Sequence, residues 1–286
     1  MAARKPEPKR APARKAQKKA APNPKARPST TAATQKSKAA TQKSKAATQK
    51  PRAATQKPKA TARKPKATSA SDARALFALL RARHHDAHCE LDHENPFQLV
   101  VATVLSAQST DVMVNRITPE LFQSYPTPEA LARAEQGDVE AKLNKIGMFR
   151  QKARNIIGLS KRLVERHGGA VPRTLAELVE LPGVGRKTAN VVLGVAFGAP
   201  EGVVVDTHVQ RISQRLGLTR ETEPVEIEQD LMKLFPREDW DMLSHVLIFH
   251  GRRLCTARAP ACAACPVNQT CPSAFHAENV GRKARV

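Results

Sequence analysis

The sequence predicts an all-α protein with two helical subdomains, preceded by a disordered basic tail. Two observations carry this prediction. From residue 71 onward, apolar residues recur with the 3.6-residue period of helices, and the one strand-like run, Gly202–Val205, is too short to build a sheet. Before residue 71, the chain is dominated by Ala, Lys, Pro, Thr and Gln, and a seven-residue unit recurs four times between Ala32 and Lys59.

The tail, residues 1–70, holds most of the excess charge. It contains 21 of the 48 Lys/Arg residues and one acid, Glu7, so residues 71–286 carry a net charge of only +2. Alanines are the only apolar residues of the repeats and cannot bury enough surface to offset chain entropy. Because a polycation favours a polyanion, we interpret the tail as a DNA-tethering arm, similar in composition to linker-histone tails. A merely solubilising tail and an organelle transit peptide are the alternatives.

Membrane association is not expected. No apolar run approaches the ~20 residues that span a bilayer, and the N-terminus lacks the apolar core of a secretory signal. We therefore expect a cytoplasmic, nucleoid-associated bacterial protein that acts as a monomer.

Helix boundaries follow from capping signals along the chain. Asn95 with Pro96 opens a helix that is apolar nearly all round, and Thr127 with Pro128 forms a second N-terminal signal. A long helix ends at Gly168, and Thr174 opens a capping box before a short helix that ends at Leu181. Further helices are predicted over Arg186–Phe197, Thr207–Leu216, Val225–Leu234 and Asp239–Leu254.

The most informative stretch is LPGVGRKTANVVLGVAFG, Leu181–Gly198. Glycines at both turn positions allow positive φ and remove side chains from the surface. The backbone amides of residues 183–187 are then free to face a phosphate at the positive end of the next helix. Such a turn would hold a DNA backbone without reading its sequence. An ordinary αα-hairpin is the alternative for a PGxG turn taken alone.

A lysine and an aspartate follow this turn. Lys187 lies in the first turn of the new helix, where partial desolvation and nearby amides can lower its pKa towards a nucleophilic value. Asp206 comes 19 residues later, immediately before a helix, and can be that helix's N-cap. A carboxylate beside an amine is also what glycosidic cleavage needs, because it can accept a proton and stabilise oxocarbenium character.

LPGVGRKTANVVL followed by VDTHVQR resembles the helix-hairpin-helix, Gly/Pro-rich loop and aspartate signature of the endonuclease III family. The resemblance covers about residues 71–286. It implies that Lys187 is a Schiff-base nucleophile and Asp206 its acidic partner. It also implies a helical barrel domain with the helix-hairpin-helix over residues 91–199, and an iron–sulfur domain formed by residues 71–90 and 200–286.

Four of the five cysteines form a C-terminal cluster with the spacing C-x6-C-x2-C-x5-C: Cys255, Cys262, Cys265 and Cys271. Four thiolates can hold zinc or a [4Fe–4S] cluster, and chemistry alone favours zinc as the commoner structural metal. The spacing resembles the C-terminal [4Fe–4S] site of endonuclease III-type enzymes, so we predict an iron–sulfur cluster with a structural role. The loop between the first two cysteines carries one cation, Arg258, where the family often has more, and we hypothesise that the tail compensates in DNA affinity.

Reaction at the sugar requires that the damaged nucleotide leave the duplex stack. The resemblance implies that Gln108, in LSAQSTD, fills the gap, with Met148, in IGMFRQKA, as a second wedge. Asp111 is expected to cap the next helix rather than to touch substrate. The expected DNA contacts are Gln108, Met148, Gly183, Val184, Gly185, Arg186 and His208.

The predicted function is a base-excision-repair DNA glycosylase with β-elimination lyase activity on duplex DNA that contains oxidised or ring-saturated pyrimidines or abasic sites. An adenine-mismatch glycosylase of the same superfamily is one alternative, although that group usually lacks a lysine at position 187 and carries a further C-terminal domain. A non-enzymatic DNA-compacting protein is the other, and it would not need Lys187 and Asp206 together.

Overall fold

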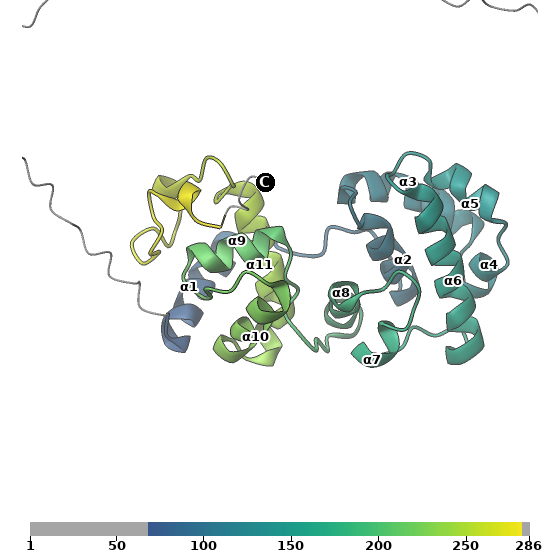
Figure 1. Ribbon diagram of the computed structural model, residues 1–286, viewed down its shortest axis with the longest axis horizontal. Helices are drawn as coiled ribbons and strands as arrows, with labels where there is room; N and C mark the ends of the chain where they lie inside the picture. The colour runs from purple at the N-terminus through teal and green to yellow at the C-terminus, as the bar shows by residue number, and fades with distance from the viewer. Residues whose placement is uncertain (1–67, 282–286) are drawn as a thin grey trace, which may run out of the picture. The chain divides into compact units, whose positions relative to one another are not determined.

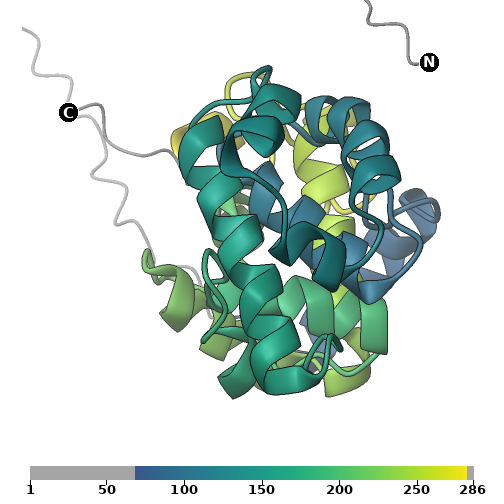
Figure 2. The same ribbon diagram turned by 90° about the vertical axis from the view of Figure 1, so that its right-hand side faces the viewer.

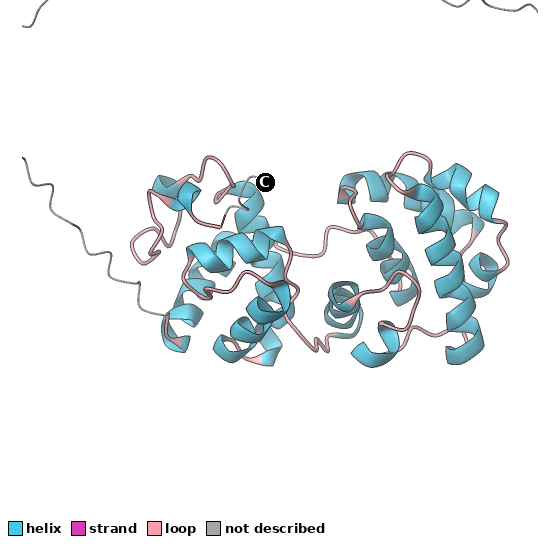
Figure 3. Ribbon diagram, viewed as in Figure 1, coloured by secondary structure: helices cyan, strands magenta, loops and turns pink. Residues whose placement is uncertain are grey.

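The computed structural model describes residues 68–281, and the repetitive tail lies outside this range. All regular elements in the described residues are helices (Figure 3), which confirms the all-α prediction. The α-helices are α1 (Ala70–Arg83), α2 (Pro96–Ser106), α3 (Asp111–Ser124), α4 (Pro128–Ala132), α5 (Gln136–Leu143), α6 (Phe149–His167), α7 (Leu175–Leu178), α8 (Arg186–Phe197), α9 (Thr207–Arg215), α10 (Pro224–Leu234) and α11 (Trp240–Arg253). Short 3-10 turns cover Arg237–Asp239, Cys262–Ala264 and Ala277–Asn279.

The helices pack around two apolar cores (Figure 1). The first core is formed by α2 to α8, with α2 at its centre: residues 99–102 of that helix are fully buried. The second core joins α1 to α9, α10 and α11, so the N-terminal helix packs against elements more than 100 residues away in the chain. Figure 2, turned by 90°, shows the elements of both cores again. No described helix is both long enough and apolar enough to cross a bilayer.

Most capping signals act as the sequence predicts. The side chains of Asn95, Thr127 and Thr174 accept hydrogen bonds from the first turns of α2, α4 and α7. Gly168 ends α6 in the left-handed conformation, with φ 56°. Two expectations differ: α7 ends at Leu178 rather than at Leu181, and residues 202–205 form no strand. A non-helical turn of three residues therefore precedes the glycine hairpin.

Candidate active site

The hairpin between α7 and α8 is built around one strained glycine. Gly183 has φ +81°, and a Cβ there would come within 2.8 Å of Asn155 Nδ2. Gly185 has an ordinary φ of −96° and is the N-cap of α8, with no side-chain cap. A Cβ on Gly185 would meet nothing within 4 Å, so the space in front of it is open. The first amides of α8 thus face an open surface, which suits an anion.

Lys187 and Asp206 line the same pocket, between the two cores. Lys187 is exposed on the first turn of α8, so the protein alone does not desolvate it as the sequence suggested. Asp206 is the N-cap of α9: its Oδ1 accepts hydrogen bonds from the backbone amides of His208 and Val209, both at 2.8 Å. In the described structure these bonds use only Oδ1, and they hold the carboxylate in a fixed orientation at the pocket.

A buried acidic group on the other side of the pocket was not predicted. Asp111 does not cap α3, because Thr110 does so by accepting the amide of Met113. Instead, Asp111 Oδ2 accepts from Arg252 Nη2 at 3.0 Å, and Arg252 also pairs with Glu90. Burial raises the pKa of Asp111, the charge of Lys187 lowers it, and that of Asp206 raises it. The only sequence signal for this role is the position of Asp111 three residues after Gln108.

The two predicted wedge residues lie on loops and do not line the pocket. Gln108 follows α2 with φ 55°, and Met148 precedes α6 with φ 54°. Both side chains are exposed, and the exposed fraction of Met148 is 51%. Left-handed conformations in residues other than glycine are strained and cluster at functional sites.

Arg186 and His208, both expected to contact DNA, have partners within the protein. The Arg186 guanidinium binds Glu228 on α10 through Nε at 2.8 Å and Nη2 at 3.0 Å. Asn190 Nδ2 donates to the same carboxylate at 3.1 Å, so α8 is joined to α10. His208 is half-buried against Arg211 at 3.2 Å, and burial lowers its pKa. The backbone amide of Arg186 remains at the start of α8, next to the hairpin.

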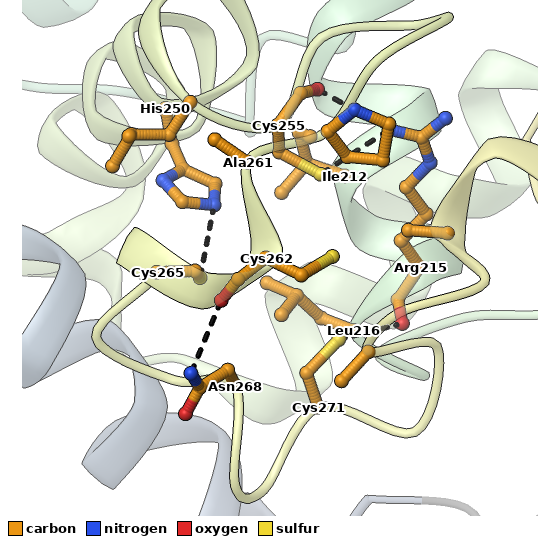
Figure 4. Close-up of a pocket in the computed structure, with 14 residues that line it drawn as sticks. Ile212, Arg215, Leu216, His250, Cys255, Ala261, Cys262, Cys265, Asn268 and Cys271 are labelled. Atoms are coloured by element: carbon orange, nitrogen blue, oxygen red, sulfur yellow. Dashed lines mark hydrogen bonds between the residues drawn. The ribbon is translucent and has the colours of Figure 1, made fainter.

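The four C-terminal cysteines surround one cavity (Figure 4). No three His, Cys, Asp or Glu side chains of the described residues are arranged to hold a single metal ion. Burial raises the pKa of Cys265, and it raises that of Cys271 to about 11. Neutral thiols are therefore favoured there unless a bound cation offsets the burial of thiolates.

A buried arginine fixes the loop that carries Cys255. Arg215 on α9 is 1% exposed, and its Nη1 donates to Cys255 Sγ at 3.2 Å and to the carbonyl of Thr256 at 2.8 Å. The same guanidinium also binds the carbonyls of Ala257 and Val280, at 3.0 Å each. On the opposite side, His250 Nε2 lies 3.7 Å from Cys265 Sγ.

A helical scaffold that places a glycine hairpin, a lysine and an N-capping aspartate around one pocket is that of a helix-hairpin-helix DNA-repair protein. Residues 101–237 match the HhH-GPD superfamily of base excision DNA repair proteins. The chain is 51% identical over 202 residues to Endonuclease III of Synechocystis sp., covering 71% of this chain and 92% of that protein. It is 53% identical over 186 residues to Endonuclease III of Bacillus subtilis, covering 65% and 84%.

Among solved structures, a trapped covalent intermediate of an endonuclease III with DNA, an estranged-adenine complex, is 45% identical with a TM-score of 0.68. It aligns with 72% of this chain and 97% of that one. The chain therefore belongs to the endonuclease III family and is a base-excision-repair DNA glycosylase with AP-lyase activity. These comparisons favour neither the adenine-mismatch nor the non-enzymatic alternative.

Proposed function

We propose that Lys187 is the nucleophile of this enzyme and that its substrates are oxidised or ring-saturated pyrimidines and abasic sites in duplex DNA. The observation that carries the assignment is that Lys187 and Asp206 line one pocket beside the open hairpin. The relative trapped as a covalent intermediate with DNA supports a covalent mechanism.

In the proposed reaction, the Lys187 amine attacks C1′ of the extruded nucleotide. A C–N bond forms, the glycosidic bond breaks, and the base leaves with the electron pair and gains a proton. The resulting iminium acidifies the C2′ proton, whose removal expels the 3′ phosphate by β-elimination. Asp206 accepts a proton from the Lys187 ammonium before attack and stabilises positive charge at the sugar. Because Lys187 is exposed, the bound nucleotide must exclude water from it.

DNA is held, in this proposal, by the backbone amides of residues 183–187 on a phosphate and by Gln108 and Met148 in the vacated stack. The amide of Arg186 belongs to that set, whereas its guanidinium stays on Glu228. His208 lies two residues after Asp206 and lines the approach of the DNA strand. We propose that one protomer suffices for all these contacts.

The four C-terminal cysteines are proposed to hold a [4Fe–4S] cluster. Their thiols line one cavity, yet no three of them are set to bind a single ion, which suits a multi-atom cluster better than zinc. Arg215 Nη1 provides a hydrogen bond to a cysteine sulfur, a group that stabilises thiolate charge. When bound, the cluster would supply the metal–thiolate bonds that fix the C-terminal loop.

Borohydride trapping on a thymine-glycol duplex tests the nucleophile. We expect a covalent adduct with the natural protein and with Lys161→Ala, whose lysine is exposed on α6, and none with Lys187→Ala. Asp206→Asn keeps an oxygen that can cap α9 but loses the charge, and we expect slower trapping with an unchanged Tm. An adduct of normal yield with Lys187→Ala would reject the assignment. Faster reaction on an adenine mismatch than on thymine glycol would favour the related glycosylase.

A further inference from the structure

The loops that carry Gln108 and Met148 lie against each other. An added Cβ on Gly147 would come 3.9 Å from the carbonyl oxygen of Gln108, so the two backbones are in van der Waals contact. Gln108 and Met148 are two of the three described residues other than glycine with positive φ. A strained backbone of this kind persists only where surrounding contacts fix it. The contacts that fix these two loops therefore decide how both exposed side chains are presented.

Lys152, on the first turn of α6, connects the two loops. Its backbone amide makes the helical hydrogen bond to the Met148 carbonyl, at 3.0 Å. Its ammonium reaches in the other direction and donates to Ser109 Oγ at 2.8 Å, directly after Gln108. One residue thus contacts the Met148 position through its backbone and the neighbour of Gln108 through its side chain.

The ammonium of Lys152 is unusual for its surroundings. The residue is only 3% exposed, and it forms no ion pair with any carboxylate of the described residues. Burial lowers its pKa. A buried lysine without a counter-charge destabilises a fold unless its hydrogen bonds compensate. A methionine of similar length would fill the space without that penalty, so stability alone does not explain a lysine here.

We propose that Lys152 is a positioning residue that joins the Gln108 and Met148 loops into one rigid wedge through its hydrogen bond to Ser109. This inference rests on the proposed function, because it requires that both side chains enter the duplex when the damaged nucleotide is extruded. Joining the loops in advance lowers the entropy lost when they enter the stack. The expected consequence is faster extrusion, with no effect on the chemical step at Lys187.

Two substrates separate extrusion from chemistry. A duplex with thymine glycol beside 2-aminopurine requires extrusion, and the fluorescence of 2-aminopurine reports the opened stack. A single-stranded oligonucleotide with one abasic site has no partner base to displace and reports the lysine chemistry. Single-turnover cleavage is measured on both substrates for the natural protein, Lys152→Met, Ser109→Ala, the double variant, and Lys161→Met as the matched control on α6.

We expect Lys152→Met to slow duplex cleavage by about ten- to a hundredfold, the worth of one charge-assisted hydrogen bond. The 2-aminopurine signal should fall in parallel, while single-strand cleavage changes at least tenfold less. Lys152→Arg, which keeps a donor, should restore part of the rate. The double variant should be no slower than Lys152→Met, because both changes remove the same contact. The Tm of Lys152→Met should be unchanged or raised.

Equal losses on the two substrates, or losses that multiply in the double variant, would overturn the wedge. An unchanged duplex rate in Lys152→Met would do the same. Failure of the natural protein to cleave the single-stranded abasic site would instead overturn the proposed function, and the wedge with it. The two failures are therefore distinguishable.

Discussion

The link between α8 and α10 yields a prediction whose size follows from the structure. The carboxylate of Glu228 accepts from Arg186 Nε and Nη2 and from Asn190 Nδ2. The Glu228 side chain is 6% exposed, whereas that of Arg186 is 46% exposed. Asn190 is 2% exposed, and its Oδ1 already has no partner among the described residues. Glu228 is therefore the acceptor on which a buried amide depends.

Glu228→Ala removes both interactions, and the two losses differ in size. The amide of Asn190 would be left unsatisfied in the interior, at a cost of about 1–3 kcal/mol. Arg186 can turn to water, so its contribution is discounted to about 1 kcal/mol. The expected destabilisation is about 2–4 kcal/mol, which corresponds to a fall in Tm of roughly 5–15 °C for a folded part of this size. Glu228→Gln keeps an acceptor for Asn190 and should lose about half as much.

Thermal unfolding followed by circular dichroism measures both variants. Arg186→Ala completes a double-mutant cycle: it strands a buried carboxylate, so it should also destabilise, and the double variant should lose less than the sum of the two singles. Additive losses would show that the ion pair is not coupled. A fall in Tm below about 2 °C for Glu228→Ala would refute the reasoning from burial.

Three further predictions concern other parts of the molecule. Deleting residues 1–60 should weaken binding to undamaged duplex and flatten its salt dependence, while single-turnover cleavage stays near normal; an unchanged salt slope would reject the tethering role. Arg215→Met should lower the iron content per chain and cost about 3 kcal/mol or more, since several carbonyls lose their buried donor; normal iron would contradict this. Gly183→Ala should lose stability, since it combines φ +81° with a contact to Asn155, whereas Gly185→Ala should lose DNA affinity alone. Equal Tm values for the two alanine variants would contradict the hairpin geometry.

Local signals predicted the helices well. The predicted bounds of α8, Arg186–Phe197, match the structure because a glycine stands at each end of an apolar stripe, and Gly198 closes the helix with φ 61°. Thr127 and Thr174 act as caps because capping depends on residues two or three positions away. The end of α7 was misplaced, because a three-residue turn and a continuing helix have the same apolar pattern before Pro182.

The surroundings of the site could not be predicted in the same way, because its partners are distant in sequence. Arg186 and Glu228 are 42 residues apart, and Lys152 and Ser109 are 43 apart. Asp111 was expected to be a cap because Asp is common at that position, but Thr110 stands one residue earlier and reaches the same amide. Arg252, which binds Asp111, comes from α11, 141 residues away. Periodicity and capping rules carry no information about such pairs.

The distribution of charge suggests how affinity and accuracy are divided in this enzyme. Residues 71–286 have a net charge of +2, so counterion release by the folded part alone contributes little to DNA affinity. Two cations beside the pocket are also occupied: Arg252 pairs with Glu90 and Asp111, and Arg186 with Glu228. Phosphate binding then falls to the uncharged amides of the hairpin, which fix position but attract weakly over distance. A tail with a net charge of +20 supplies the long-range attraction that these amides cannot, and its effect on binding should disappear at high salt, whereas that of the hairpin should not.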